Sequence, residues 1–167
     1  MDRIIGIDYG RKRTGLAVSD PLGIFASAMD TVHSANIVDY IKKYAENESV
    51  KRFVVGYPKN LDGTPSEAAA DVDVFLKVLS KSFPDIPVDL EDERFTSVLA
   101  HQAMIDGGMK ASRRQDKTEV DKISAAIILQ SWLDRHNGDS SGAQAGTVEV
   151  PENLSTTKGR TGKKRRK

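Results

Sequence analysis

The stretch Arg3-Ile4-Ile5-Gly6-Ile7-Asp8-Tyr9-Gly10 is a short apolar run that ends in an acid and a turn. The basic turn Arg11-Lys12-Arg13 follows, then an extended run over 14–19 and another over 24–32. Three extended runs separated by short turn signals predict an antiparallel meander. A hairpin at the basic turn places Asp8 at a strand end beside three cations.

After the meander, the sequence alternates between helical and strand patterns. We expect four helices: 37–45, capped by Asn36; from a capping box at Thr64 to about 82; from 96 or 97 to about 106; and from 119 to about 136. Two further strands are expected at 53–56 and 88–91. This order predicts an α/β fold, in which helices flank a five-stranded mixed sheet and the two later strands run parallel to the first.

Composition limits the class of protein. A chain of 167 residues without cysteine is long enough for one domain, and it has no disulfide, thiol nucleophile or Cys-ligated metal. The three histidines show no metal-ligand spacing, which leaves oxygen ligands from Asp and Glu. The sequence contains neither a membrane span nor a signal peptide, so we expect a soluble, cytoplasmic protein.

Charge divides the chain at residue 138. Residues 1–138 carry 18 basic and 21 acidic side chains, whereas the last ten residues carry seven basic side chains and no acidic one. The segment 139–167 has few apolar residues to offset its ordering entropy. We therefore predict a folded domain over 1–138 and a disordered basic tail over 139–167, which attracts polyanions.

Three acids are the candidate catalytic and metal-binding residues: Asp8, Glu93 and Asp121. The first ends a strand, the second follows the fifth strand, and the third lies in the first turn of the last predicted helix. Parallel strands share one carboxyl edge, where sites form. Three neighbouring carboxylates repel one another unless a cation lies among them, and two Mg²⁺ (or Mn²⁺) ions there would support phosphodiester hydrolysis, with Asp8 shared between them.

Basic side chains flank these acids in the sequence, and they are the candidate nucleic-acid-binding residues: Arg11, Lys12, Arg13, Lys110, Arg113 and Arg114. Each feature alone also has an ordinary explanation. An acid after a strand serves as a turn residue, an acid near a helix start is favoured by the helix dipole, and a basic turn is a common exposed hairpin tip. We assign His101 and Trp132 to helix packing.

Four blocks of the sequence together resemble the YqgF (RuvX) family of the RNase H-like superfamily, whose members are named as Holliday junction resolvases and as pre-16S rRNA nucleases. The blocks are Gly6–Gly10, Val55–Gly63, Asp92–Thr96 and Val120–Leu129, in the family's order. The resemblance implies an RNase H-like fold with strand order 3-2-1-4-5. It also implies a metal-dependent centre of Asp8, Glu93 and Asp121, with Glu93 preferred to Asp92. Tyr57 departs from the family's Gly-Leu-Pro block.

The resemblance implies a metal-dependent endonuclease that matures the 5′ end of pre-16S rRNA, resolves Holliday junctions, or both. The expected partner is nucleic acid, not a membrane, and the protein is expected to be a monomer or a homodimer. The alternative is a non-catalytic nucleic-acid-binding or ribosome-associated factor on the same fold. The first block also resembles the phosphate loop of actin-like ATPases and sugar kinases, but these need two such domains.

Deleting residues 139–167 is expected to lower the salt dependence of nucleic-acid binding, because the basic tail contributes non-specific phosphate contacts. Cleavage should persist in the truncated protein. Binding titrations at several salt concentrations and a cleavage assay check this, and a complete loss of activity would contradict it.

Overall fold

The structure is a computed structural model, and it describes residues 1–94 and 96–138. Its strands are β1 (Asp2–Tyr9), β2 (Arg13–Ser19), β3 (Ala26–His33), β4 (Ser49–Tyr57) and β5 (Val88–Asp92). Its helices are η1 (Ser34–Asn36), α1 (Ile37–Ala45), α2 (Ala69–Ser82), α3 (Thr96–Asp106), α4 (Ala111–Arg114) and α5 (Lys117–Gly138). The predicted tail, 139–167, lies outside the described residues.

The five strands form one mixed sheet in the order β3-β2-β1-β4-β5. Strands β1, β2 and β3 pair antiparallel, whereas β4 pairs parallel with both β1 and β5. The meander, the direction of the later strands and the expected strand order are therefore confirmed. Because β1, β4 and β5 run the same way, their carboxyl ends lie at one edge of the sheet.

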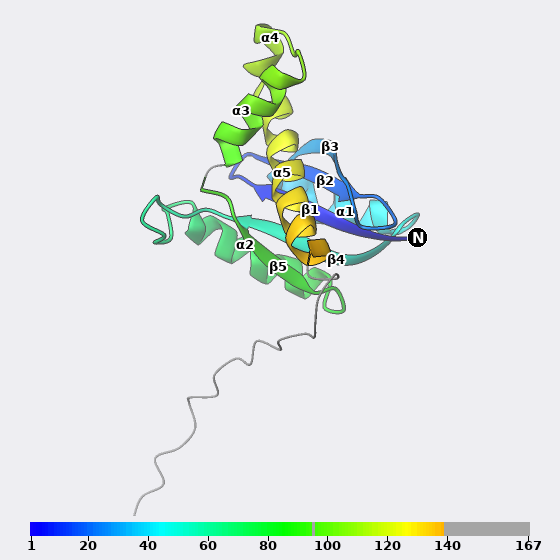
Figure 1. Ribbon diagram of the computed structural model, residues 1–167. Coiled ribbons are helices and arrows are strands. Elements are labelled where there is room, and N and C mark those ends of the chain that lie inside the picture. The colour runs from blue at the N-terminus through cyan, green and yellow to red at the C-terminus, as the bar shows by residue number, and fades with distance from the viewer. Residues whose placement is uncertain (95, 139–167) are drawn as a thin grey trace, which may run out of the picture.

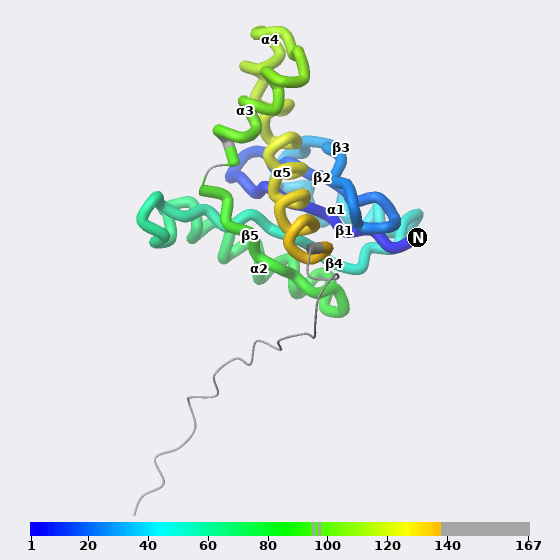
Figure 2. The backbone as a smooth tube through the Cα atoms, in the orientation of Figure 1, coloured from blue at the N-terminus to red at the C-terminus, as the bar shows by residue number. Residues whose placement is uncertain are grey.

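Side chains of β1 alternate between two hydrophobic layers, as the period of a strand requires. Ile5 and Ile7 belong to the layer beneath α1 and α2, whereas Ile4 belongs to the layer beneath α5. Helix α5 crosses one face of the sheet, and α1 and α2 cover the other (Figure 1). The short α3 and α4 lie beside the first half of α5, beyond the strand ends (Figure 2).

Glycines allow α5 to approach the sheet closely. A Cβ at Gly6 would lie 2.7 Å from the Cβ of Leu129 and 2.9 Å from the carbonyl oxygen of Ala125. A Cβ at Gly15 would overlap the backbone carbonyl of Asp121. Helix α5 therefore rests on the backbone of β1 and β2, where no larger residue fits without displacing the helix.

Three local expectations differ from the structure. Helix α2 begins at Ala69 instead of at the predicted capping box, because the backbone N–H and hydroxyl of Thr64 both donate to Asp62 within the preceding loop. Asn36 makes no side-chain cap to α1, since it ends the 3₁₀ turn η1. The basic stretch 109–117 contains the short helix α4, which the sequence pattern did not predict.

Within the described ranges, 1–94 and 96–138, no helix combines the length and the apolar composition that crossing a bilayer requires.

Replacing Gly15 by alanine is expected to destabilise the protein by about 3 kcal/mol and to lower Tm by about 6 °C or more, because the added methyl group overlaps the α5 backbone. Gly23→Ala is the control, since a Cβ there meets nothing within 4 Å and adds only the strain of a positive φ. Thermal unfolding of both variants checks this, and equal Tm values would contradict it.

Candidate functional site

Asp8 lies one residue before the end of β1, on the face that α5 covers. Its partner on β2 is Gly15, and its same-face neighbour on β1 is Gly6. Both neighbours lack side chains, so the Asp8 carboxylate occupies the space between the end of β1 and the first turns of α5.

Glu93 reaches the same place from the end of β5. Its backbone N–H donates to the carbonyl oxygen of Tyr57 at 3.3 Å, which continues the β4–β5 pairing by one residue. Its side chain lies over Gly56, because a Cβ at Gly56 would be 2.5 Å from Oε2 of Glu93. Any larger residue at position 56 would displace the Glu93 carboxylate from the site.

The carboxyl groups of Asp8 and Glu93 hydrogen-bond to each other. Burial raises the pKa of Asp8 to about 6, the hydrogen bond from Glu93 opposes this rise, and the charge of Asp121 adds to it. Burial and the adjacent Asp8 charge raise the pKa of Glu93 to about 9. Near neutral pH the pair therefore retains one proton, which the Glu93 carboxyl donates to the Asp8 carboxylate.

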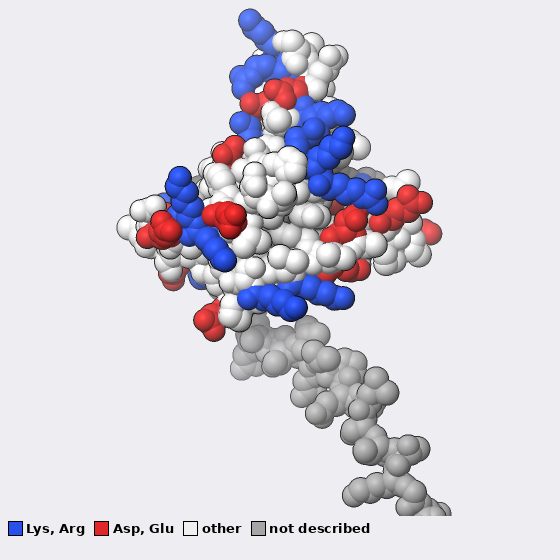
Figure 3. Space-filling view, turned by 180° about the vertical axis from the view of Figure 1, so that it is seen from behind, with Lys and Arg blue, Asp and Glu red and all other residues white. Residues whose placement is uncertain are grey.

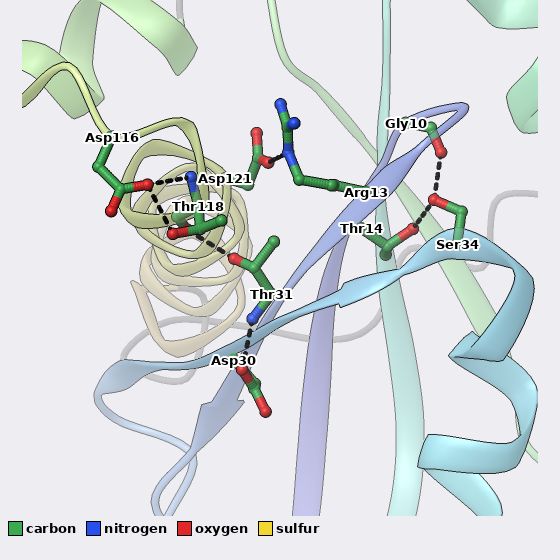
Figure 4. A network of polar contacts seen from close by, with 9 residues as sticks. All are labelled: Gly10, Arg13, Thr14, Asp30, Thr31, Ser34, Asp116, Thr118 and Asp121. Carbon is green, nitrogen blue, oxygen red and sulfur yellow. Dashed lines mark hydrogen bonds and ion pairs between the residues drawn. The ribbon is translucent and has the colours of Figure 1, made fainter.

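Asp121 lies near this pair but is held by a different partner. It stands in the second turn of α5, since the helix begins at Lys117, two residues earlier than expected. Arg13 is the first residue of β2, and its Nε donates to Oδ2 of Asp121 at 3.0 Å (Figure 4). A second contact ties this end of α5 to the sheet, because the Thr31 hydroxyl donates to the carbonyl oxygen of Thr118 at 2.6 Å.

The structure thus brings two of the three predicted acids into contact, and the third is near enough to shift the pKa of Asp8. As the side chains stand, no three Asp, Glu or His residues in 1–94 and 96–138 are close enough to hold one metal ion. The donor set nevertheless fits a hard cation, because all three groups are carboxylates and two of them share a proton that a cation would replace. In the structure the third carboxylate, Asp121, is paired with Arg13.

The predicted nucleic-acid-binding residues surround the acids unevenly. Arg11 pairs with Asp71 of α2 at 2.6 Å, and Arg113 pairs with Glu119 at 3.4 Å. Lys12 and Lys110 are exposed, and Arg114 is half-buried beside α5. Viewed from behind, some Lys and Arg side chains lie at the tip of the molecule, and a second basic group lies below it, with acidic side chains between the two (Figure 3).

Sequence reasoning missed two features of the site. The role of Gly56 had one signal, its position two residues before the polar loop that follows β4. His101 was assigned to helix packing, but it is exposed and lines a pocket with Arg13 and Asp121. Trp132 does pack in the α5 layer, and its indole N–H donates to Asp89 at 3.0 Å.

The strand order, the helices on both faces and the acids at the carboxyl ends of β1 and β5 define an RNase H-like fold. The RuvC of T. thermophilus in complex with a Holliday junction substrate matches 83% of this chain and 97% of its own, with a TM-score of 0.52 and 18% identity. The fowlpox virus resolvase in complex with Holliday junction DNA matches 80% and 98%, with a TM-score of 0.50 and 11% identity. These likenesses show the fold.

The family model described as "RuvX: Holliday junction resolvase" matches residues 2–135, and the chain belongs to this family. A relative from Phocaeicola vulgatus, named "Putative pre-16S rRNA nuclease", is 54% identical over 134 residues, which are 80% of this chain and 96% of the relative. A relative of the same name from Christiangramia forsetii is 50% identical over 133 residues, 80% of this chain and 98% of its own.

The metal-free protein is expected to lose stability as pH rises. Both pKa values are raised in the folded state, so the protonated pair stabilises the fold fully below the ordinary values of 3.8 and 4.5, and this contribution is lost as pH rises to about 9. Glu93→Gln should remove the repulsion and raise Tm at pH 8 by about 3 °C or more. Thermal unfolding in EDTA at several pH values measures this effect.

Asp92→Asn serves as the control for that measurement. Asp92 is adjacent in sequence but is exposed and pairs with Arg94 at 2.8 Å, so its replacement should lower Tm slightly. A lower Tm for both variants at pH 8 would show that Glu93 is not strained by its neighbour.

Proposed function

We propose that this protein is a divalent-metal-dependent nuclease that hydrolyses phosphodiester bonds in structured nucleic acid. The observation that carries the proposal is the contact between Asp8 and Glu93, two carboxyl groups that share a proton at the carboxyl edge of the sheet. Such a pair is costly to the fold without a cation, and it occurs in a chain of the resolvase family.

Asp8, Glu93 and Asp121 would hold the metal as oxygen ligands. Bound Mg²⁺ or Mn²⁺ would supply positive charge and lower the pKa of an attacking water, and two such ions would also stabilise the leaving oxygen. Glu93 must give up the proton that it shares with Asp8, and Asp121 must turn away from Arg13. The close packing of α5 on Gly6 and Gly15 keeps these groups within reach of one another.

The basic groups at the hairpin and α4 would bind the phosphodiester backbone on either side of the acids. Arg11 is anchored by Asp71, which keeps its guanidinium beside the end of β1. Lys12 and Lys110 carry their charge in solvent, where they attract a polyanion regardless of base sequence.

Two substrates fit this arrangement. The names of the relatives favour a precursor of 16S rRNA, matured at its 5′ end, whereas the family description and the neighbours solved with junctions favour a four-way DNA junction. Resolution of a junction needs two cuts and therefore a homodimer, whereas a single cut in rRNA needs one active site. A nuclease of either kind would act in the cytoplasm, where both substrates are found in bacteria.

Asp8→Asn is expected to lower the rate of cleavage by at least about 100-fold with Mg²⁺ or Mn²⁺, because it removes a charged ligand at the centre of the site. Asp39→Asn, an exposed acid on α1, is the matched control and should cleave like the wild type. Rates are compared on a pre-16S rRNA fragment and on a four-way DNA junction.

Unchanged cleavage by Asp8→Asn would refute the assignment of the site. Tight binding of either substrate by the wild type, without cleavage in Mg²⁺ or Mn²⁺, would instead indicate the non-catalytic nucleic-acid-binding factor.

A further inference from the structure

A pocket of about 380 Å³ lies beside Asp121, where α3, α4 and the start of α5 meet β2. It is separate from the contact between Asp8 and Glu93, but Asp121 and Arg13 form part of its wall. The other lining residues are His101, Arg114, Gln115, Lys117 and Val120. The pocket therefore adjoins the candidate metal site on the side of α4.

Two of the three Arg and Lys side chains of this pocket, Arg114 and Lys117, have no acidic partner among residues 1–94 and 96–138. Arg114 is half-buried, and its side chain forms no hydrogen bond or ion pair with any residue of 1–94 or 96–138. The Lys117 side chain likewise has no carboxylate partner within that part of the chain, whereas the neighbouring Arg113 pairs with Glu119. A half-buried guanidinium without an acid is typical of a site for an anion, because burial without a counter-charge is costly.

Arg13 connects the pocket to the candidate metal site. Only its Nε contacts Asp121, so its terminal nitrogens are available to a second acceptor. Its side chain is 38% exposed and that of Asp121 is 26% exposed, so neither group is locked in the interior. In Figure 4 the guanidinium of Arg13 lies between β2 and α5 and points toward Asp121.

We propose that this pocket binds one phosphate of a nucleic-acid strand through Arg114, Lys117 and Arg13, and that Arg13 moves to this phosphate from Asp121. The proposal rests on the nuclease function proposed above and names a phosphate subsite for it. Guanidinium groups bind phosphate through paired N–H donors, and two guanidinium groups and an ammonium group converge here. Gln115 and Val120 supply amide and apolar surface for the attached sugar.

The movement of Arg13 links two binding events. Without nucleic acid, Arg13 neutralises Asp121 and competes with a metal ion for it. When a phosphate takes Arg13, the Asp121 carboxylate becomes free to bind the ion. Nucleic acid should therefore tighten metal binding, and by linkage metal should tighten nucleic-acid binding by the same factor.

The first experiment measures nucleic-acid binding in EDTA, where no cleavage occurs. The double variant Arg114→Gln, Lys117→Gln is expected to bind a four-way junction and a pre-16S rRNA fragment about 10-fold more weakly than the wild type, and with a salt slope smaller by about 1. The control is Lys42→Gln, Lys43→Gln on α1, which makes the same change of charge on exposed residues of the opposite face. Equal losses in both double variants would overturn the phosphate subsite.

The second experiment follows Mn²⁺ binding by electron paramagnetic resonance and needs no turnover. For the wild type, a phosphorothioate-linked oligonucleotide that resists cleavage should tighten Mn²⁺ binding by about 5-fold or more. Arg13→Gln should bind Mn²⁺ more tightly than the wild type without the oligonucleotide and show no further tightening with it. Lys42→Gln, which removes an exposed charge on α1, should retain the coupling.

The outcomes separate this inference from the proposed function. If the wild type cleaves nucleic acid but Arg13→Gln keeps the wild-type Mn²⁺ affinity and coupling, the movement of Arg13 is wrong and the nuclease function stands. If no metal supports cleavage while both binding effects occur, the subsite and its coupling stand and the nuclease function is wrong.

Discussion

The contact between α5 and the sheet is the constraint on which the rest of this structure depends. Gly6 and Gly15 let the backbone of the helix rest directly on β1 and β2, and the Gly15 contact falls at Asp121 itself. This packing holds an acid from the last helix beside an acid from the first strand, although more than 100 residues separate them. A methyl group at position 15 would push the helix away and separate the two carboxylates. The geometry of the site is therefore a consequence of backbone packing, and not of the acids, which repel one another.

The charges of the site favour the binding of a cation. Burial and mutual repulsion raise the pKa of both Asp8 and Glu93, so the pair retains a proton near neutral pH. Asp121 is neutralised by Arg13. Each negative charge is thus compensated within the protein, by the shared proton at Asp8 and Glu93 and by Arg13 at Asp121. In the proposals made above, a metal ion replaces the proton and a phosphate takes Arg13 from Asp121.

Much of the fold was predictable because its signals are local. Three extended runs separated by short turns predict the meander, and the pair Gly107-Gly108 predicts the end of α3. Errors occurred where a side chain had two possible partners. Thr64 has the pattern of a helix cap, but its hydroxyl bonds Asp62 within the loop, and α2 begins five residues later. His101 was expected to pack within its helix, but α3 is buried along one side only, and His101 lies on the exposed side.

The sequence by itself determined the class of fold, the three candidate acids and the strand end at which two of them lie, because hydrophobic period and turn residues act over short distances. It also carried the four blocks that place the chain in its family. Only the tertiary structure decided that Glu93 contacts Asp8 over Gly56, that Asp121 is held by Arg13, and that Arg114 lines a pocket beside them with no acidic partner in the described part of the chain. These contacts join residues far apart in the chain, and they depend on how closely α5 packs and which way each side chain turns, which no local pattern specifies.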